Sequence, residues 1–238
     1  MKPFAPDINC LWFPPDANAP PPPDGTPAVL FLHGVGERGN GYGELSKVAD
    51  WGLPKFRAEG RPLSQDPFPF AVIAPQCPPD KTWCDDEVLD ALDRLLVGIK
   101  AKDDIDNSRL HLSGFSMGGI GAFCFALRRP ACFASMSAVC GRCLTPDALT
   151  SLARLPIWIA YAEDDEITEL AQGSKIAAQR LVRYGNLIDH RYRLGHHGDL
   201  GPHIRTCDAA YAEPELYRWL GARRLRPNLQ AGDSGHEC

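Results

Sequence analysis

The sequence predicts a single α/β domain, in which a mostly parallel twisted sheet carries helices on both faces in a three-layer sandwich. Strand-like and helix-like segments alternate along nearly the whole chain, a pattern typical of parallel sheets. Apolar residues make up 44% of the 238 residues, so one full domain can bury a sizeable core, and the length is short for two. We therefore expect one domain over residues 1–224, with a Pro-rich connection at 14–27 and a flexible tail at 225–238.

The individual elements follow from the spacing of apolar residues. Residues 8–13 are expected as an edge strand, and the continuous apolar run at 28–32 suits a strand buried on both faces. The prolines between them exclude a helix or a central strand, so this segment is a stiff surface connection. Further strands are expected at 70–74, 109–112, 133–139, 156–161 and 187–193, and helices at 85–100, 120–127, 170–182 and 214–223.

Charge and composition exclude several classes of function. The net charge of −5 and the pI near 5.8 argue against nucleic acid or an anionic membrane as a partner. No apolar stretch approaches the roughly 20 residues of a spanning helix. The first residues lack the apolar core of a signal peptide, so a cytoplasmic location is expected.

Nine cysteines are more than usual, but their number is odd and no export signal accompanies them. Cys140 and Cys143 form a C-x-x-C pair with no second pair at zinc-ribbon spacing. Reduced thiols are therefore expected, with no metal site and no cofactor.

The most informative motif is a G-x-S-x-G pattern, with Ser116 between Gly114 and Gly118. It lies between the expected strand at 109–112 and the expected helix at 120–127. A sharp strand-to-helix turn at this place holds a serine hydroxyl out as a nucleophile, and the glycines are needed because a Cβ would collide with nearby backbone. The motif therefore predicts a serine hydrolase.

A serine hydroxyl needs a histidine to take its proton and a carboxylate to orient that histidine. In this architecture the three occur in the order serine, acid, histidine. The acid is expected in the acidic run 163–166 that follows the strand at 156–161, with Asp164 and Asp165 best placed. His196, His197 and His203 follow the last expected strand, and each is a candidate for the base.

The oxyanion formed by attack on a carbonyl needs preorganised backbone N–H donors. One is expected from Met117, the residue after the nucleophile. The other is expected from Val35, in the Gly-rich turn 33–39 that follows the early buried strand. A phosphate-binding loop is the rival interpretation of that turn, and it fails because no G-K-[ST] follows the glycines.

Three ordered segments carry a resemblance to a known family: residues 31–39, residues 74–78 together with Trp83, and residues 114–119. Together they resemble the α/β-hydrolase superfamily, and within it the carboxylesterase, phospholipase and dienelactone-hydrolase-like group of esterases and predicted peptidases. The likeness runs from about residue 28 to residue 220. It implies the α/β-hydrolase fold.

The resemblance also ranks the site residues. Aligned with the acid segment of that group, the chain places the acid at Asp164, with Asp165 as the alternative. The group's histidine loop matches at His197, with His203 as the alternative and His196 as a third choice. The expected tryptophan of that loop is missing and the loop is lengthened.

The remaining pocket residues come from the same motifs. Gly34 lies in the oxyanion turn, where a bare backbone can approach the substrate. Trp83 and Phe115 are expected either to wall the acyl pocket or to pack in the core. Gln76 is expected to hydrogen-bond near the oxyanion loop or to brace it.

These features predict hydrolysis of a small-molecule carboxylic ester through an acyl-enzyme on Ser116. Serine at the elbow, where dienelactone hydrolases proper carry cysteine, favours ordinary esters. Two alternatives stay open: a hydrolase-like binding protein without the reaction, and a peptidase or acyltransferase that uses the same three residues. The sequence does not indicate the oligomeric state.

Overall fold

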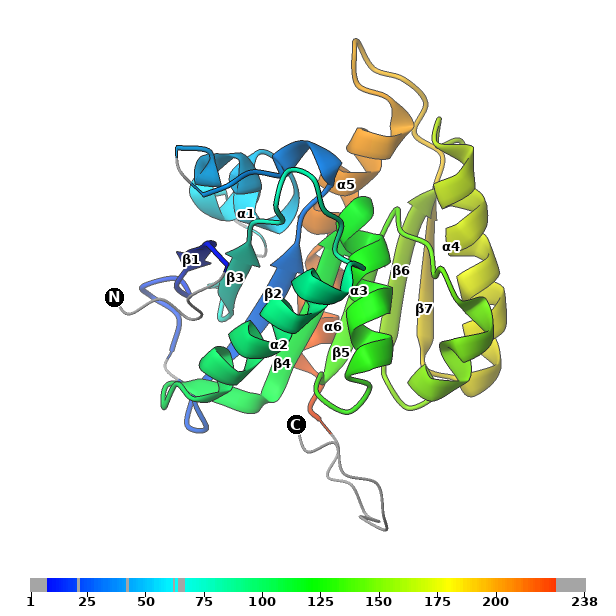
Figure 1. Ribbon diagram of the computed structural model, residues 1–238. Helices are drawn as coiled ribbons and strands as arrows, with labels where there is room; N and C mark the ends of the chain where they lie inside the picture. The colour runs from blue at the N-terminus through cyan, green and yellow to red at the C-terminus, as the bar shows by residue number, and fades with distance from the viewer. Residues whose placement is uncertain (1–7, 21, 42, 62, 64–66, 226–238) are drawn as a thin grey trace.

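A central seven-stranded sheet organises the molecule, as seen in a computed structural model that describes residues 8–225 apart from 21, 42, 62 and 64–66 (Figure 1). The strand order is β1-β3-β2-β4-β5-β6-β7, and every pair is parallel except β1 with β3. The strands are β1 (Cys10–Phe13), β2 (Thr26–Leu32), β3 (Ala71–Pro75), β4 (Ile105–Phe115), β5 (Ser135–Val139), β6 (Ile157–Ala162) and β7 (Leu187–Tyr192).

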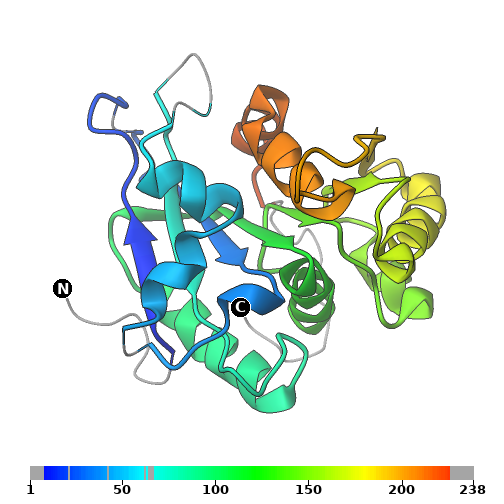
Figure 2. The same ribbon diagram turned by 90° about the horizontal axis from the view of Figure 1, so that it is seen from above.

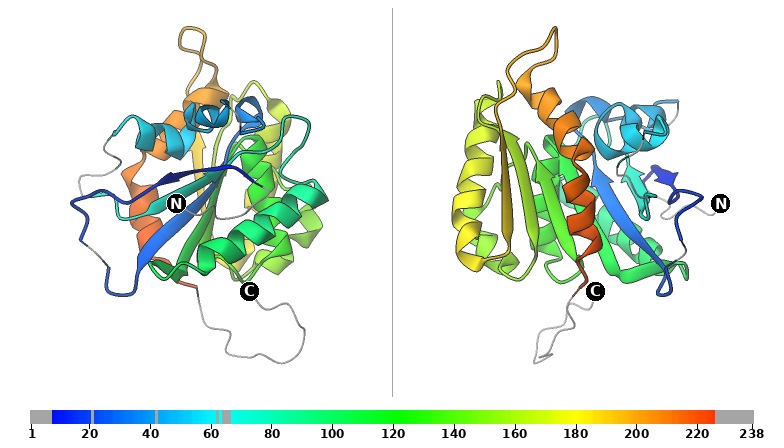
Figure 3. Two further views of the ribbon diagram at one scale, coloured as in Figure 1. Left: turned by 60° about the vertical axis from the view of Figure 1, so that its left-hand side comes forward. Right: turned by 180° about the vertical axis from the view of Figure 1, so that it is seen from behind.

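Helices cover both faces of this sheet, so the molecule has three layers (Figures 1 and 2). One face packs against α2 (Asp86–Lys100), α3 (Met117–Arg128) and α4 (Thr168–Leu181). The other packs against α1 (Gly52–Ala58), α5 (Pro202–Ala212) and α6 (Pro214–Gly221), which lie in front of the strands in the rear view of Figure 3. Four short 3-10 helices complete the described elements: η1 (Val35–Glu37), η2 (Leu45–Ala49), η3 (Pro146–Leu152) and η4 (Val182–Tyr184).

Strand β2 shows why its apolar run is continuous. Ala28, Leu30 and Leu32 enter the core beneath α2 and α3, whereas Val29 and Phe31 enter the core beneath α1 and α5. Alternate side chains of a strand point to opposite faces, so a strand covered on both sides must be apolar throughout. In the described part of the chain, no helix combines the length and the hydropathy needed to cross a bilayer.

The structure confirms the predicted fold class, the edge strand β1 and the non-helical connection that follows it. Two helices, α1 and α5, are not predicted by the sequence pattern. The buried face of α5 carries His203, Thr206 and Cys207, so apolar spacing does not reveal it. The single-domain boundary stays a prediction, and nearly all of the predicted tail, residues 226–238, lies outside the described residues.

The cysteines differ in part from expectation. Cys84 and Cys124 form a disulfide with a Cα–Cα distance of 5.7 Å, which corrects the prediction of reduced thiols at these two positions. The bond ties the segment before α2 to the middle of α3, which follows the serine motif. Cys140 and Cys143 are both free and buried, so the C-x-x-C pair is not a disulfide.

Candidate active site

Ser116 stands at a sharp turn between β4 and α3. Its backbone has φ 55° and ψ −117°, a left-handed conformation that costs a non-glycine residue about 1 kcal/mol or more. The turn is held by the Ser116 N–H, which donates to the Val139 carbonyl at 2.9 Å. A Cβ on Gly114 would lie 2.1 Å from the Gly118 oxygen, and one on Gly118 would lie 1.8 Å from the Leu32 oxygen. The glycines of the motif are therefore sterically required.

His203 brings its ring to this serine from the first turn of α5. Its Nε2 lies 2.9 Å from Ser116 Oγ. Pro202 occupies the start of the helix, where a missing N–H costs nothing. The His203 backbone N–H donates to the Glu166 carboxylate at 3.0 Å, and the ring packs against Phe115 with centroids 5.0 Å apart. The imidazole is thus fixed by its backbone and by its neighbour.

Asp165 completes a hydrogen-bonded row. Its Oδ2 lies 2.8 Å from His203 Nδ1, and its Oδ1 accepts the Ile167 N–H at 2.8 Å. The Asp165 side chain is fully buried. An ionised carboxylate can only accept, so Nδ1 carries the proton and Nε2 is left to accept the Ser116 hydroxyl. The three side chains therefore stand in the arrangement that general-base activation of a serine requires.

The first-choice residues Asp164 and His197 are not the ones that meet the serine. The Asp164 carboxylate accepts the N–H groups of Leu194 and Gly195 at 3.3 and 2.8 Å, which keeps it at the base of a loop. His197 is exposed, and its backbone pairs with Leu200 at the tip of that loop. The structure instead brings the two alternatives, Asp165 and His203, to Ser116.

The correction has a physical reason in the loop 193–201. This segment projects beyond the rest of the molecule between β7 and α5 (orange-yellow at the top of Figure 1), and His196 and His197 lie in it, both exposed. Counting from the strand end places the histidine too early by the length of this projection. The Gly201–Pro202 pair was the available signal, because proline at the first helical position marks where α5 begins.

The acidic run 163–166 serves the same segment with each of its four carboxylates. Glu163 pairs with Arg193 at 3.2 Å. Asp164 binds the loop base and Asp165 binds His203, as described above. Glu166 accepts the His203 N–H and lies against Gly201, where a Cβ would fall 2.2 Å from its Oε1. The four consecutive acids thus hold the histidine segment in place.

The predicted oxyanion donors lie at the adjoining backbone turns. Val35 opens η1 directly after β2, and Met117 opens α3 directly after the serine. The two turns touch, because Gly118 fits against the carbonyls of Leu32 and His33. The turn that carries Val35 and the turn that carries Met117 are therefore neighbours, and their role as oxyanion donors stays a prediction.

Glu37 is a functional candidate that the sequence did not single out. It is the third residue of η1, and its carboxyl curls back towards Gly34 and hydrogen-bonds the backbone there. Its side chain is 6% exposed, and its Oε2, 3.9 Å from His33 Nδ1, has no hydrogen-bond partner. Burial raises the pKa of this carboxyl to about 7. The signal was present in the Gly34-Val35-Gly36-Glu37 spacing, which resembles a capping box.

The other predicted pocket residues mainly support this turn. Gln76 is buried, and its amide donates to the Glu37 and Glu44 carbonyls at 3.0 and 2.8 Å, so it braces the loop. Trp83 is fully buried and donates its indole N–H to the His33 carbonyl at 2.9 Å, which favours the core-packing interpretation. Phe115 packs on His203, and Gly34 lies between Glu37 and the Phe115 ring.

The remaining buried histidines hydrogen-bond within the core. His33 Nδ1 donates to the Gly34 carbonyl and Nε2 accepts the Cys77 N–H. His111 Nδ1 hydrogen-bonds Ser135 Oγ on the neighbouring strand at 2.8 Å. Burial lowers the pKa of His33 to about 4 and that of His111 to about 3, so both stay neutral.

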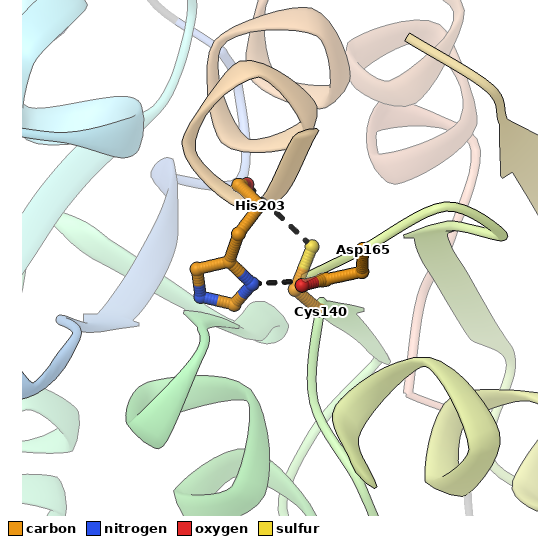
Figure 4. Close-up of side chains that lie close together, drawn as sticks. All are labelled: Cys140, Asp165 and His203. Atoms are coloured by element: carbon orange, nitrogen blue, oxygen red, sulfur yellow. Dashed lines mark hydrogen bonds and ion pairs between the residues drawn. The ribbon is translucent and has the colours of Figure 1, made fainter. Parts of the chain in front are cut away.

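One group in the described residues brings three potential metal ligands together. Cys140, Asp165 and His203 are all buried, with ligand atoms within 4.8 Å of one another (Figure 4). Asp165 and His203 already bind each other at 2.8 Å, so the carboxylate and the imidazole nitrogen are satisfied without an ion. Chemically, the His203 ring is placed to remove a proton from Ser116.

Comparisons with known proteins show which families and structures the chain is similar to. A model of the phospholipase/carboxylesterase family matches residues 86–200. A thermostable esterase of known structure is 25% identical with a TM-score of 0.71, over 91% of this chain and 59% of that chain. The present chain therefore spans less than two thirds of that esterase. No curated protein sequence matches the chain.

Two further solved structures share the fold over nearly their whole length. Esterase PE8 is 20% identical with a TM-score of 0.60, over 90% of this chain and 99% of its own. The Staphylococcus aureus fluorophosphonate-binding serine hydrolase FphF is 14% identical with a TM-score of 0.65, over 92% and 96%. The chain has the α/β-hydrolase fold, and it is similar to esterases of that fold. The comparisons support a function of the serine-hydrolase type.

Proposed function

We propose that the protein is a serine hydrolase that cleaves small carboxylic esters through an acyl-enzyme on Ser116. The observation that carries the proposal is the row of hydrogen bonds from Ser116 Oγ through His203 to Asp165, at 2.9 and 2.8 Å. The strained backbone at Ser116 supports it further, because such strain persists where function needs it.

In the proposed reaction, Ser116 Oγ attacks the ester carbonyl while His203 Nε2 takes its proton. Asp165 keeps the Nδ1–H tautomer and stabilises the imidazolium that forms. The backbone N–H groups of Val35 and Met117 hold the negative oxygen of the tetrahedral intermediate. His203 then protonates the leaving alcohol, and it activates the water that releases the acid.

The preference for small esters is supported by the short connection between β5 and β6. The connection between β5 and β6 holds only η3 as regular structure, so over its described residues this stretch contributes no separate lid domain. Substrates that need a large apolar cover, such as long-chain lipids, are therefore expected to be poorer than short-chain esters.

The direct test is hydrolysis of a p-nitrophenyl ester series by wild type and Ser116→Ala. Short-chain esters should be cleaved best, and the variant should lose about 10⁴-fold or more in kcat/KM. Ser113→Ala is the matched control, because Ser113 is buried on β4 and bonds Tyr211 and Ser137. Equal turnover by wild type and Ser116→Ala would overturn the proposal.

A peptidase or acyltransferase with the same three residues is the second candidate. Product analysis with competing alcohols and peptides separates these activities from ester hydrolysis. A hydrolase-like binding protein is the remaining alternative, and it predicts that a fluorophosphonate fails to label Ser116 in the folded protein.

A further inference from the structure

Cys140 lies directly behind the Asp165–His203 pair. It follows β5, with no solvent exposure, and Figure 4 shows its sulfur beside the Asp165 carboxyl group and beneath the His203 backbone. The thiol donates to the His203 carbonyl at 3.8 Å, and its sulfur lies within 4.8 Å of ligand atoms of both Asp165 and His203. One side chain thus contacts the acid and the segment that carries the base.

The backbone conformation at Cys140 is unfavourable for a residue with a side chain. Its φ is 48°, and among the described non-glycine residues only Ser116 shares a positive φ. The turn is fixed by its neighbours, since Val139 holds the Ser116 N–H and Gly141 packs against Gly119. Glycine would adopt this conformation freely, whereas a side chain costs about 1 kcal/mol or more. A cysteine at this strained position indicates that its thiol has a functional role.

The thiol is neutral, which suits it to a carboxylate. Burial, and then the charge of Asp165, raise the pKa of Cys140 well above its usual value. The single S–H can turn from the His203 carbonyl to the Asp165 carboxylate, and there it acts as a weak donor to the anion. The buried sulfur also keeps water from the inner side of that carboxylate. The other titratable neighbours of the thiol are also neutral near pH 7: burial raises the pKa of Tyr192 to about 12, and those of Cys207 and Tyr211 well above their usual values.

We propose that Cys140 is a positioning residue of the active site, whose thiol closes the inner side of the Asp165 carboxylate and holds it against His203. This inference rests on the proposed function of Ser116, His203 and Asp165. It assigns Cys140 no contact with substrate. It explains why a side chain with a weak donor occupies a position whose backbone favours glycine.

Three substitutions test the role of the thiol. Cys140→Gly removes the side chain and relieves the strained φ, whereas Cys140→Ala removes the donor and keeps the strain. Cys140→Ser keeps a donor of similar size. Cys143→Ala is the matched control, because Cys143 is also buried and free but is not among the group around Asp165 and His203.

The readouts are kcat/KM per folded enzyme across pH, and the thermal unfolding midpoint. For Cys140→Ala and Cys140→Gly, kcat/KM should fall about 5- to 10-fold, the effect of losing one weak donor to a charge. The acid limb of the pH profile should move up by roughly half a pH unit, because a donor on Asp165 opposes protonation of the adjacent ring. Cys140→Ser should restore both.

A purely structural role predicts a different pattern, in which the unfolding midpoint changes while kcat/KM per folded enzyme and the acid limb stay as in wild type. That result would overturn the proposal, as would a Cys140→Ser variant that behaves like Cys140→Ala. The Glu166 carboxylate, which faces the His203 N–H, and the Glu37 carboxyl, with its pKa of about 7, are unchanged in all variants.

The His203 ring titration, followed by NMR, reports the same shift without any substrate. If the wild type hydrolyses no ester, the proposed function fails, and the NMR titration still decides whether Cys140 acts on the Asp165–His203 pair. Equal ring titrations in wild type, Cys140→Ala and Cys140→Gly would overturn the inference by itself.

Discussion

The buried carboxyl of Glu37 makes a quantitative prediction about stability and pH. Its pKa rises from the ordinary value of 4.5 to about 7 in the folded protein, chiefly because burial removes the charged form from water. Below about pH 4.5 the group is protonated in both the folded and the unfolded state, so it contributes nothing. As the pH rises towards 7 the unfolded chain ionises first, and folding stability is lost.

The size of the loss follows from the shift. About 2.5 pH units at 1.36 kcal/mol each correspond to about 3 kcal/mol, fully expressed above pH 7. Glu37→Gln removes the charge and keeps an oxygen that can accept from Gly34. The variant should therefore match wild type at pH 4 and exceed it by about 3 kcal/mol in unfolding free energy at pH 8.

Urea unfolding at a series of pH values measures this difference. Glu215→Gln, at an exposed glutamate in the first turn of α6, is the matched control and should show no such trend. A gain from Glu37→Gln that is the same at pH 4 and pH 8, or a variant less stable than wild type at pH 8, would contradict this prediction.

Three further predictions concern the site and its scaffold. Asp165→Asn should lower kcat/KM by about 10³- to 10⁴-fold, because the histidine loses its correct tautomer, whereas Asp164→Asn should lower it by less than about 10-fold. Steady-state kinetics that show the reverse order would contradict the assignment of Asp165 as the acid. Gly118→Ala should lower the free energy of unfolding by more than about 4 kcal/mol or prevent folding, because the new Cβ would lie 1.8 Å from a backbone oxygen. A variant that melts at the same temperature as wild type would contradict this. Cys84→Ser should lower the free energy of unfolding by about 4 kcal/mol, because it opens the link between Cys84 and Cys124, which are 40 residues apart. Urea unfolding measures this loss, and a wild type that is equally stable with and without reductant would contradict it.

Much of the fold was predictable because local rules agree with the tertiary structure. The apolar run at 28–32 had to be a two-sided strand, and prolines excluded any helix before it. The serine elbow was predictable for the same reason, since the Gly114 and Gly118 contacts leave no room for a side chain. Where backbone sterics determine the local structure, the sequence pattern predicts that structure directly.

The identities of the histidine and the acid could not be predicted from backbone sterics. Their identity depends on how far the loop 193–201 projects, and loop length is not encoded in any periodic pattern. Asp164 and Asp165 are chemically equal neighbours, and only the direction of the chain after β6 turns one to the loop and the other to His203. The buried Glu37 was missed because its environment is created by distant elements.

In the proposed function, Ser116 and His203 act together as nucleophile and base. The rate at which a fluorophosphonate probe modifies Ser116, located by peptide mass mapping, tests it in wild type, His203→Ala and His197→Ala. We expect an adduct on Ser116 in wild type and in His197→Ala at similar rates, and a rate lower by at least about 10³-fold in His203→Ala. Rapid labelling of Ser116 in His203→Ala, or its loss in His197→Ala, would contradict the account.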